Sequence, residues 1–204
     1  SMVAMKHYGL NVALDSLLPL VYLECPLVVV VGDDPGSYSS IQAEQDSRWF
    51  SRLGWIPTLE PADADEAKEM TKIAFKLAWK YKIPVLVRLT TRVCHTRSLV
   101  KCGKIILPKK KGKFVKNQKM SALGAGPTVA RHALLLKKIE KIKKEIFEKT
   151  NLNYISGSKS GKFGIIAEGV AFYHAKEALL KLNLNVPTLK IGFNFPFPQE
   201  KVKK

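Results

Sequence analysis

Two uninterrupted apolar runs constrain this chain more than any other feature. Residues 27–32 read Leu-Val-Val-Val-Val-Gly, and residues 83–89 read Ile-Pro-Val-Leu-Val-Arg-Leu. Runs of this length without polar alternation are typical of strands that are buried on both faces. Between them, residues 63–81 have small and apolar side chains at helical spacing after an acidic first turn, which predicts a helix. Strand, helix and strand in this order predict a right-handed crossover between parallel strands.

A second unit of the same kind lies near the C-terminus. Residues 163–167 predict a strand, residues 171–182 a helix and residues 188–192 another strand. Ahead of this unit, residues 128–149 have apolar side chains along one helical stripe and predict an amphipathic helix. Residues 151–161 are rich in Ser, Gly and Lys and are typical of a polar linker.

The expected fold class is therefore α/β, with two parallel-sheet units joined by a helical connector. We expect an α/β domain in residues 1–105, a basic connector with the amphipathic helix in residues 106–160, and a second α/β domain in residues 161–204. Each domain shows only two or three strands, whereas a free-standing doubly wound domain has about five. We therefore expect the first domain to be incomplete at its N-terminus and the second at its C-terminus.

The formal net charge of +17 arises entirely in the second half of the chain. Residues 1–100 carry 11 basic and 11 acidic side chains, whereas residues 101–204 carry 23 and 6. The lysines of residues 109–119 and of the amphipathic helix could follow a nucleic-acid backbone, and a module of that kind, or a non-catalytic scaffold, is the alternative function. Only one aromatic residue, Phe114, lies among these lysines, so no base-stacking platform is evident. We favour a solvated surface or an acidic protein partner over nucleic acid; the Lys/Ile-rich pattern with interspersed glutamates is also typical of a thermophile.

Cysteine usage and hydropathy exclude several classes. Cys25, Cys94 and Cys102 are odd in number and lack Cys-x-x-Cys spacing, so neither a disulfide framework nor a complete metal or cluster site is expected. No apolar run approaches the roughly 18–20 residues of a membrane span, and the N-terminus lacks the order of a secretory signal. These observations predict a cytoplasmic protein without a membrane segment.

A long polar loop, residues 32–48, follows the first apolar run. The carboxyl ends of parallel strands are where open α/β sheets bind ligands. The loop is otherwise interpreted as solvated, with Ser and Asp side chains that cap helices. Its carboxylates are suited to binding a cation or exchanging a proton, although capping is the expected role of at least two of them.

Several segments resemble the alpha subunits of indolepyruvate:ferredoxin oxidoreductases, in the thiamine diphosphate-dependent 2-oxoacid:ferredoxin oxidoreductase family. The loop motifs are Asp-Asp-Pro-Gly at 33–36, Ser-Ser at 39–40 and Glu-Gln-Asp-Ser-Arg at 44–48. The segments at 5–13 and 84–95 fall in the family's order on either side of this loop. The resemblance extends to Arg131-His132 and to residues 162–169, and so covers nearly the whole chain.

The resemblance implies the later part of a pyrimidine-type thiamine diphosphate domain, followed by the start of a transketolase-C-like domain. The complete enzyme would oxidatively decarboxylate an aryl pyruvate such as indolepyruvate to an acyl-CoA and pass the electrons to ferredoxin. Thiamine diphosphate with Mg and iron–sulfur clusters would then be bound mostly outside this chain, and none tightly by this chain alone. The implied partners are the remaining oxidoreductase subunits or domains, ferredoxin and coenzyme A as a substrate, in an oligomer.

The resemblance also implies binding residues, although no catalytic residue or metal ligand is expected in this chain. The residues expected to line the cofactor site are Asp33, Asp34, Gly36, Ser39, Ser40, Gln42, Glu44, Gln45 and Asp46. The residues expected to bind substrate are Lys6, His7, Asn11, Arg92 and His95. For His7 the alternative is packing or capping, and for Arg92 and His95 it is a structural role.

The sequence also departs from the family pattern. Ile41 separates the paired serines from Gln42, so the loop is expected to be one residue longer and its polar groups aimed differently. The strand with the glutamate that activates the thiamine ring, the Mg-diphosphate domain and a cysteine-rich segment are not among these residues. Because the cofactor needs that carboxylate and a metal, and each cluster about four Cys ligands, the isolated chain is predicted to be inactive.

Overall fold

The N-terminal part of the chain folds around a five-stranded sheet. The structure is a computed structural model and describes residues 1–38, 43–105 and 125–203. The strands, in the order in which they lie across the sheet, are β1 (Met2–Lys6), β2 (Val28–Asp33), β4 (Val85–Thr90), β3 (Thr58–Leu59) and β8 (Phe193–Phe195). The first four are parallel, and β8 pairs antiparallel with β3 at one edge. β2 and β4 lie side by side within the sheet, which explains their largely apolar sequences.

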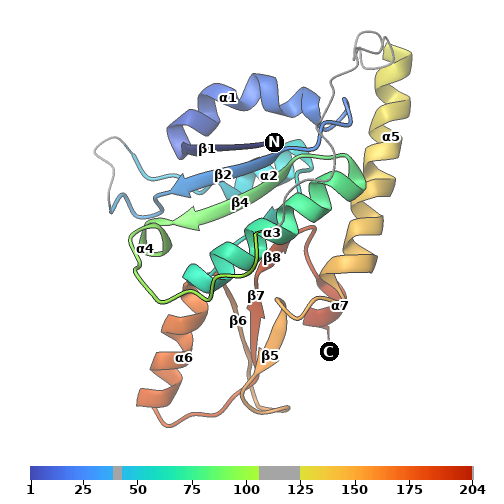
Figure 1. Cartoon of the computed structure of the whole chain (residues 1–204). Coiled ribbons are helices and arrows are strands. Elements are labelled where there is room, and N and C mark those ends of the chain that lie inside the picture. The colour runs from blue at the N-terminus through green and yellow to red at the C-terminus, as the bar shows by residue number, and fades with distance from the viewer. Residues whose placement is uncertain (39–42, 106–124, 204) are drawn as a thin grey trace.

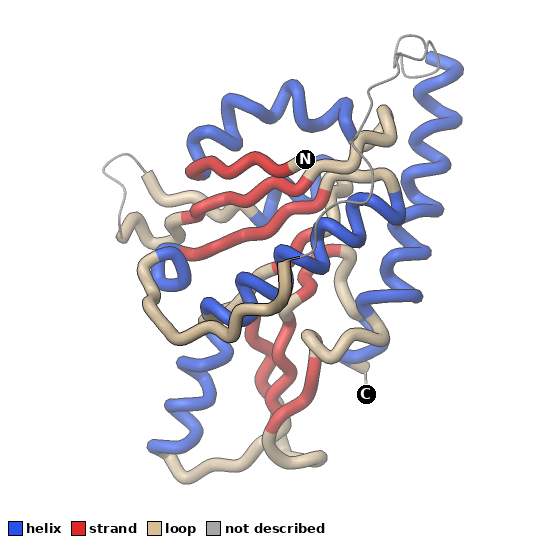
Figure 2. The backbone as a smooth tube through the Cα atoms, in the orientation of Figure 1, coloured by secondary structure: helices blue, strands red, loops and turns tan. Residues whose placement is uncertain are grey.

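Helices cover both faces of this sheet (Figures 1 and 2). They are α1 (His7–Leu20), α2 (Arg48–Gly54), α3 (Ala64–Tyr81) and the short α4 (Thr91–Cys94). The crossover through α1 and the crossover through α3 run in opposite directions across the sheet, so right-handed connections place these helices on opposite faces. α2 lies beside α1, because a side chain at Gly54 would meet Leu18 at 2.9 Å. Asp63 starts α3 as its cap, with its carboxylate accepting from the Glu66 amide at 2.8 Å.

A second, smaller sheet lies below the first in Figure 1. Its strands are β5 (Tyr154–Ser156), β7 (Thr188–Ile191) and β6 (Ile165–Glu168), in that order across the sheet. β6 and β7 are parallel, and β5 is antiparallel to β7. α6 (Ala171–Lys181) packs on one face through buried Phe172, whose ring contacts Tyr154. The one-turn helix α7 (Gln199–Val202) follows β8.

A long helix, α5 (Ala125–Ile142), runs past the amino ends of the large sheet's strands and continues into a π-helical turn, Lys143–Phe147. Leu135, Ile139 and Ile142 bury their side chains in the core of the large sheet. Lysines occupy its outer surface, and Lys138 pairs with Glu24 at 2.6 Å. No helix in the described parts of the chain is long and apolar enough to cross a membrane.

The α/β fold class is confirmed, as are the helix between the two apolar runs and the C-terminal strand, helix and strand. The division between the sheets differs from the predicted domain boundaries. β5 lies within residues 151–161, which were predicted to be a linker, and it belongs to the second sheet. β8 lies within the predicted second domain but pairs with β3 of the first sheet. The basic segment 109–119 lies outside the described residues.

Burial of the α5 stripe predicts a measurable contrast between neighbouring leucines. Leu135 is 1% exposed and Leu134 is 46% exposed. Leu135→Ala should lower the free energy of unfolding by about 2–5 kcal/mol, because it leaves a cavity between α5 and the sheet. Leu134→Ala, the matched control, should change it by about 0.5 kcal/mol or less. Urea unfolding followed by circular dichroism measures both, and equal losses would contradict the packing.

Candidate functional site

The carboxyl ends of β1, β2 and β4 meet at one edge of the large sheet, where they form a small hollow. Its volume is about 180 Å³, and its lining residues are Lys6, Gly32, Asp33, Asp34, Thr91, Cys94 and His95. The parallel register aligns Lys6 with Gly32, and Asp33 with Thr90, so the residues that end these strands lie side by side. In Figure 1 this edge carries α4 and the loop that follows β2. The hollow therefore has the position expected of a ligand site in an open α/β sheet.

A buried arginine organises the charges behind this hollow. Arg88, in β4, donates from Nε to Asp33 Oδ2 at 2.6 Å, and its NH1 lies 2.7 Å from Glu60 Oε1. Asp33 accepts two further hydrogen bonds from Ser47, from the amide at 2.9 Å and from the hydroxyl at 2.8 Å. Burial lowers the pKa of Arg88, but the carboxylates around it outweigh that effect and raise the pKa above its ordinary value. The guanidinium is therefore charged at every physiological pH.

Glu60 joins this cluster to both sheets. It follows β3, and its second oxygen accepts from Asn194 Nδ2 of β8 at 3.2 Å. A side chain at Gly169, which follows β6, would lie 2.7 Å from Glu60 Oε1, and Gly169 also has a positive φ of 51°. Only glycine satisfies both conditions without strain. Burial raises the pKa of Glu60 in spite of the positive charges of Arg88 and Arg48.

The end of the polar loop is held by a second set of charges. Arg48 forms a bidentate salt bridge with Asp46, donating from Nε at 2.8 Å and from NH2 at 2.5 Å. Its NH1 donates to Glu168, at the end of β6, at 2.9 Å. Burial alone would raise the pKa of Asp46, but hydrogen bonds from Arg48 and the charges of Arg88 and Arg48 hold that pKa below its ordinary value. The hydrogen bond with Asp46 is the main reason that the pKa of Arg48 is raised.

The loop is also fastened to the first turns of α1. Tyr8 exchanges two hydrogen bonds with the Ala43 backbone, donating to its carbonyl at 3.1 Å and accepting from its amide at 2.6 Å. Asn11 donates to Gln45 Oε1 at 2.8 Å, and the Gln45 amide reaches Ser47 at 3.3 Å. Within the loop, the Gly36 amide donates to Glu44 at 2.9 Å. These contacts hold the described parts of the loop against the first turns of α1, close to the strand ends.

Apart from His7, the predicted site residues separate into four groups. Lys6, His95, Asp33 and Asp34 line the hollow. Glu44, Gln45, Asp46, Gly36 and Asn11 have structural partners within the loop or on α1, as described above. Arg92 is exposed on α4 and is not among the lining residues. Ser39, Ser40 and Gln42 lie outside the described residues.

His7 has an unusual environment. It is fully buried at the start of α1, and its ring lies 4.2 Å from that of Tyr8. Within the described parts of the chain, neither ring nitrogen has a hydrogen-bond partner. Buried polar atoms normally have partners, so His7 has the capacity to bind a water molecule or a ligand group.

Sequence reasoning missed Arg88, Glu60, Thr91 and Cys94 as parts of this region. Thr91 donates to Asp34 Oδ1 at 2.6 Å, and the Cys94 thiol lies on the wall of the hollow, where partial burial raises its pKa. Arg88 could have been recognised, because an arginine within a run of buried apolar residues requires carboxylate partners. The identity of those partners depends on strand order, which the sequence did not specify.

The donor groups of the hollow suit one side of a larger site. Its volume is below the roughly 300–1,000 Å³ of complete small-molecule pockets. Asp33 is fully engaged by Arg88 and Ser47, so it is not a free metal ligand. In the described residues no group of three or more His, Cys, Asp or Glu side chains is arranged to hold a metal ion. The hollow is therefore suited to contact one part of a cofactor such as thiamine diphosphate. The described residues are not suited to bind the metal and diphosphate of that cofactor.

This α/β fold, with a polar hollow at the strand ends, has the arrangement of a cofactor-binding domain built on an open parallel sheet. The chain belongs to the family described as pyruvate flavodoxin/ferredoxin oxidoreductase, thiamine diphosphate-binding, which matches residues 3–151. Proteins named indolepyruvate oxidoreductase subunit IorA are similar to it. The one from Thermococcus kodakarensis is 44% identical over 210 residues, and the one from Methanothermobacter marburgensis 42% over 202 residues; each match covers 97% of this chain. The chain spans 32% of the length of both relatives.

Two solved structures have a similar fold. One is a 2-oxoglutarate:ferredoxin oxidoreductase from Magnetococcus marinus, with a TM-score of 0.69 and 18% identity. The alignment covers 100% of this chain and 43% of the oxidoreductase chain. A Pichia stipitis transketolase mutant aligns with 96% of this chain and 23% of its own, with a TM-score of 0.52 and 14% identity. At these identities the similarity establishes the fold alone.

The buried cluster predicts that removing Arg88 strongly destabilises the fold. Arg88→Met should lower the free energy of unfolding by about 3–5 kcal/mol, because it leaves the Asp33 and Glu60 carboxyl groups buried without their charge partner. Arg92→Met removes an exposed arginine close by and should change it by about 0.5 kcal/mol or less. Equilibrium denaturation measures both variants, and a mild effect of Arg88→Met would show that the cluster is not coupled as described.

The lowered pKa of Asp46 predicts that this residue stabilises the fold in a pH-dependent way. Because its pKa is lower in the folded chain than its ordinary value of 3.8, the stabilising contribution is complete above that value and is lost as the pH falls through the folded pKa. Asp46→Asn should therefore destabilise the chain at about pH 7, and the difference from the unmodified chain should shrink toward about pH 3. Urea unfolding across this range, with exposed Asp15→Asn as control, measures the difference; a difference that does not vary with pH would contradict the assignment.

Proposed function

We propose that this chain is part of the alpha subunit of a thiamine diphosphate-dependent 2-oxoacid:ferredoxin oxidoreductase, with indolepyruvate or a related aryl pyruvate as its 2-oxoacid. The complete enzyme oxidatively decarboxylates that acid to an acyl-CoA and passes the electrons to ferredoxin. The observation that carries the proposal is the polar hollow at the strand ends of a chain whose family binds thiamine diphosphate. The names of the relatives support the choice of substrate.

Under this proposal, the metal, the clusters and the activating carboxylate belong to other domains or subunits of the enzyme. Mg, the iron–sulfur clusters and the carboxylate that activates the thiamine ring are held outside residues 1–204, in further domains or subunits of an oligomer. Coenzyme A is a substrate of the assembled complex and ferredoxin its electron acceptor, and the complex works in the cytoplasm. The three cysteines, which form no disulfide in the structure, are consistent with a reducing compartment. Residues 1–204 alone then have no activity.

Within the assembled site, thiamine diphosphate would supply the carbanion chemistry of decarboxylation. The loop after β2, with Asp33, Asp34 and residues 43–46 fixed as described, forms a wall against this cofactor. Lys6 and His95 lie in the hollow with exposed side chains, and they bind the substrate carboxylate. His7 is fully buried next to Lys6 and does not line the hollow, so it acts through a water that one ring nitrogen binds and that bridges to the substrate carbonyl. Asn11 and Arg92 act from the rim, Asn11 by holding Gln45 in place.

Reconstitution tests this function and the role of Lys6 together. Residues 1–204 are combined anaerobically with the remaining polypeptide and partner subunits, and ferredoxin reduction is followed with indolepyruvate and coenzyme A. The isolated chain should be inactive and the complex active. Lys6→Met should raise KM for the 2-oxoacid by about tenfold with little change in kcat, because it removes a charge that binds the carboxylate before and during reaction.

Lys76→Met, which removes an exposed lysine on α3, is the control and should leave both constants unchanged. A cluster-loaded complex without activity would contradict the proposed function. An active complex in which Lys6→Met behaves like the control would contradict only the role of Lys6.

A further inference from the structure

The small sheet has one covered face and one open face. Tyr154, Lys190 and Ala167 are aligned across β5, β7 and β6, and this row faces α6, since the Lys190 ammonium lies over the rings of Tyr154 and Phe172. The next row, Ile155, Leu189 and Ile166, points to the opposite side, because successive residues of a strand face opposite ways. A cavity of about 770 Å³ lies on that side.

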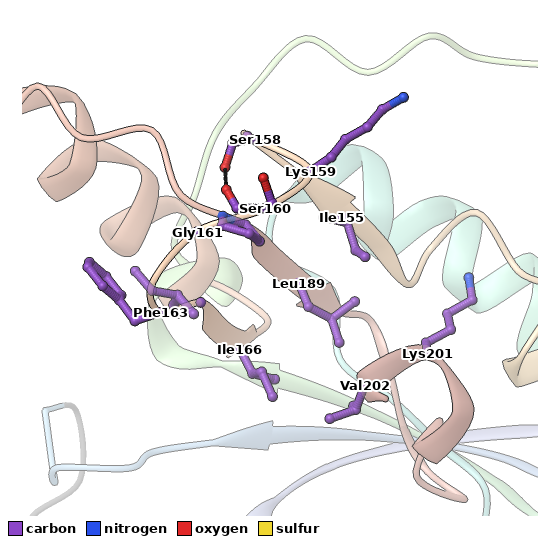
Figure 3. A pocket seen from close by; sticks show the side chains of 14 residues that line it. Ile155, Ser158, Lys159, Ser160, Gly161, Phe163, Ile166, Leu189, Lys201 and Val202 are labelled. Atoms are coloured by element: carbon purple, nitrogen blue, oxygen red, sulfur yellow. Dashed lines mark hydrogen bonds between the residues drawn. The ribbon is translucent and has the colours of Figure 1, made fainter. Parts of the chain in front are cut away.

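The open face is apolar at its centre. Figure 3 shows Ile155, Leu189, Ile166 and Val202 directed into the cavity, whereas the Lys159 side chain points away from it. Ile155 is 52% exposed and Ile166 is 53% exposed, although both belong to strands. Aliphatic side chains aligned across three strands are the pattern of a sheet face that is buried under another layer.

The rim of this face is basic. Lys159 and Lys201 are among the lining residues, which include no acidic side chain. Lys201 donates to the Thr150 and Asn153 carbonyls and so holds α7 at the edge of the cavity. The matching surface is therefore a helix with an apolar stripe and acidic flanks.

We propose that this open face is the docking surface for an amphipathic, acid-flanked α-helix supplied by polypeptide of the same subunit outside residues 1–204. The relatives provide room for such a segment, because this chain spans only 32% of their length. A helix here completes the third layer that parallel sheets require, opposite α6. The row Ile155, Leu189 and Ile166 receives its apolar stripe, and Lys159 and Lys201 flank it.

A peptide panel tests the docking surface without any catalytic measurement. Overlapping peptides of about 20 residues, long enough for several helical turns, are made from the parts of the Thermococcus kodakarensis relative that lie outside its match to this chain. Binding to residues 1–204 is followed by fluorescence anisotropy up to about 1 mM. Neighbouring peptides with an apolar stripe and acidic flanks should bind, and circular dichroism should show them becoming helical.

Charged substitutions locate the binding surface. Ile166→Asp, and separately Ile155→Asp, should weaken peptide binding by about tenfold or more, because each buries a carboxylate in the contact. Leu180→Asp is the matched control, since Leu180 is 73% exposed on α6, and it should leave binding unchanged. The two variants replace half-exposed side chains, so their thermal unfolding should stay close to that of the unmodified chain.

Three results would overturn the proposal. In the first, no peptide binds. In the second, peptides bind but Ile155→Asp and Ile166→Asp bind them as well as Leu180→Asp does. In the third, size-exclusion chromatography shows residues 1–204 as a dimer that Ile166→Asp dissociates, which would assign the face to a second copy of the chain.

Discussion

The buried guanidinium of Arg88 is the interaction on which the rest of the structure depends. A charge in the middle of a sheet is tolerated only where carboxylates and hydrogen bonds compensate its lost hydration. The compensation comes from Asp33 at the end of β2 and Glu60 after β3, so the ends of three neighbouring strands are tied at one point. The cluster does not make the fold unusually stable, because burying its charges costs about as much as their attraction returns. The cluster instead fixes the position of the loop after β2, because Asp33, the last residue of that strand, is held against Arg88.

The same cluster links the two sheets. Asn194 of β8 and the backbone at Gly169 both meet Glu60, and Arg48 joins the loop to Glu168 at the end of β6. A parallel set of contacts lies at the start of α3, where buried Lys190 pairs with Glu66 and Tyr173 donates to Asp63 at 2.7 Å. Charged and polar groups thus contribute to holding the second sheet to the first. Because these contacts are directional, they fix the orientation of the small sheet more strictly than an apolar contact of the same area.

The sequence predicted those parts of the fold that carry strong periodic signals. The central strands β2 and β4, and the helices α3 and α6, were found because their apolar spacing extends over a strand length or several helical turns. β3, β5 and β8 have only two or three residues each, and their pairing comes from partners far away in the chain. The site was predicted in the same uneven way. Asp33 and His95 follow the two apolar runs, and Lys6 was expected from the family resemblance, whereas the Glu60–Asn194 contact joins residues 134 positions apart and depends on strand order.

The hollow has buried carboxylates in its wall and basic side chains at its surface. Asp33 and Asp34 contribute two carboxylates to the wall, but both are buried and engaged, Asp33 by Arg88 and Ser47 and Asp34 by Thr91. Asp46, the next carboxylate, pairs with Arg48 and lies 3.5 Å from the Arg88 guanidinium. The charged or basic side chains that solvent reaches in the hollow are therefore Lys6 and His95. The exposed bases therefore lie where a ligand would enter, whereas the carboxylates behind them are held by arginines and hydrogen bonds.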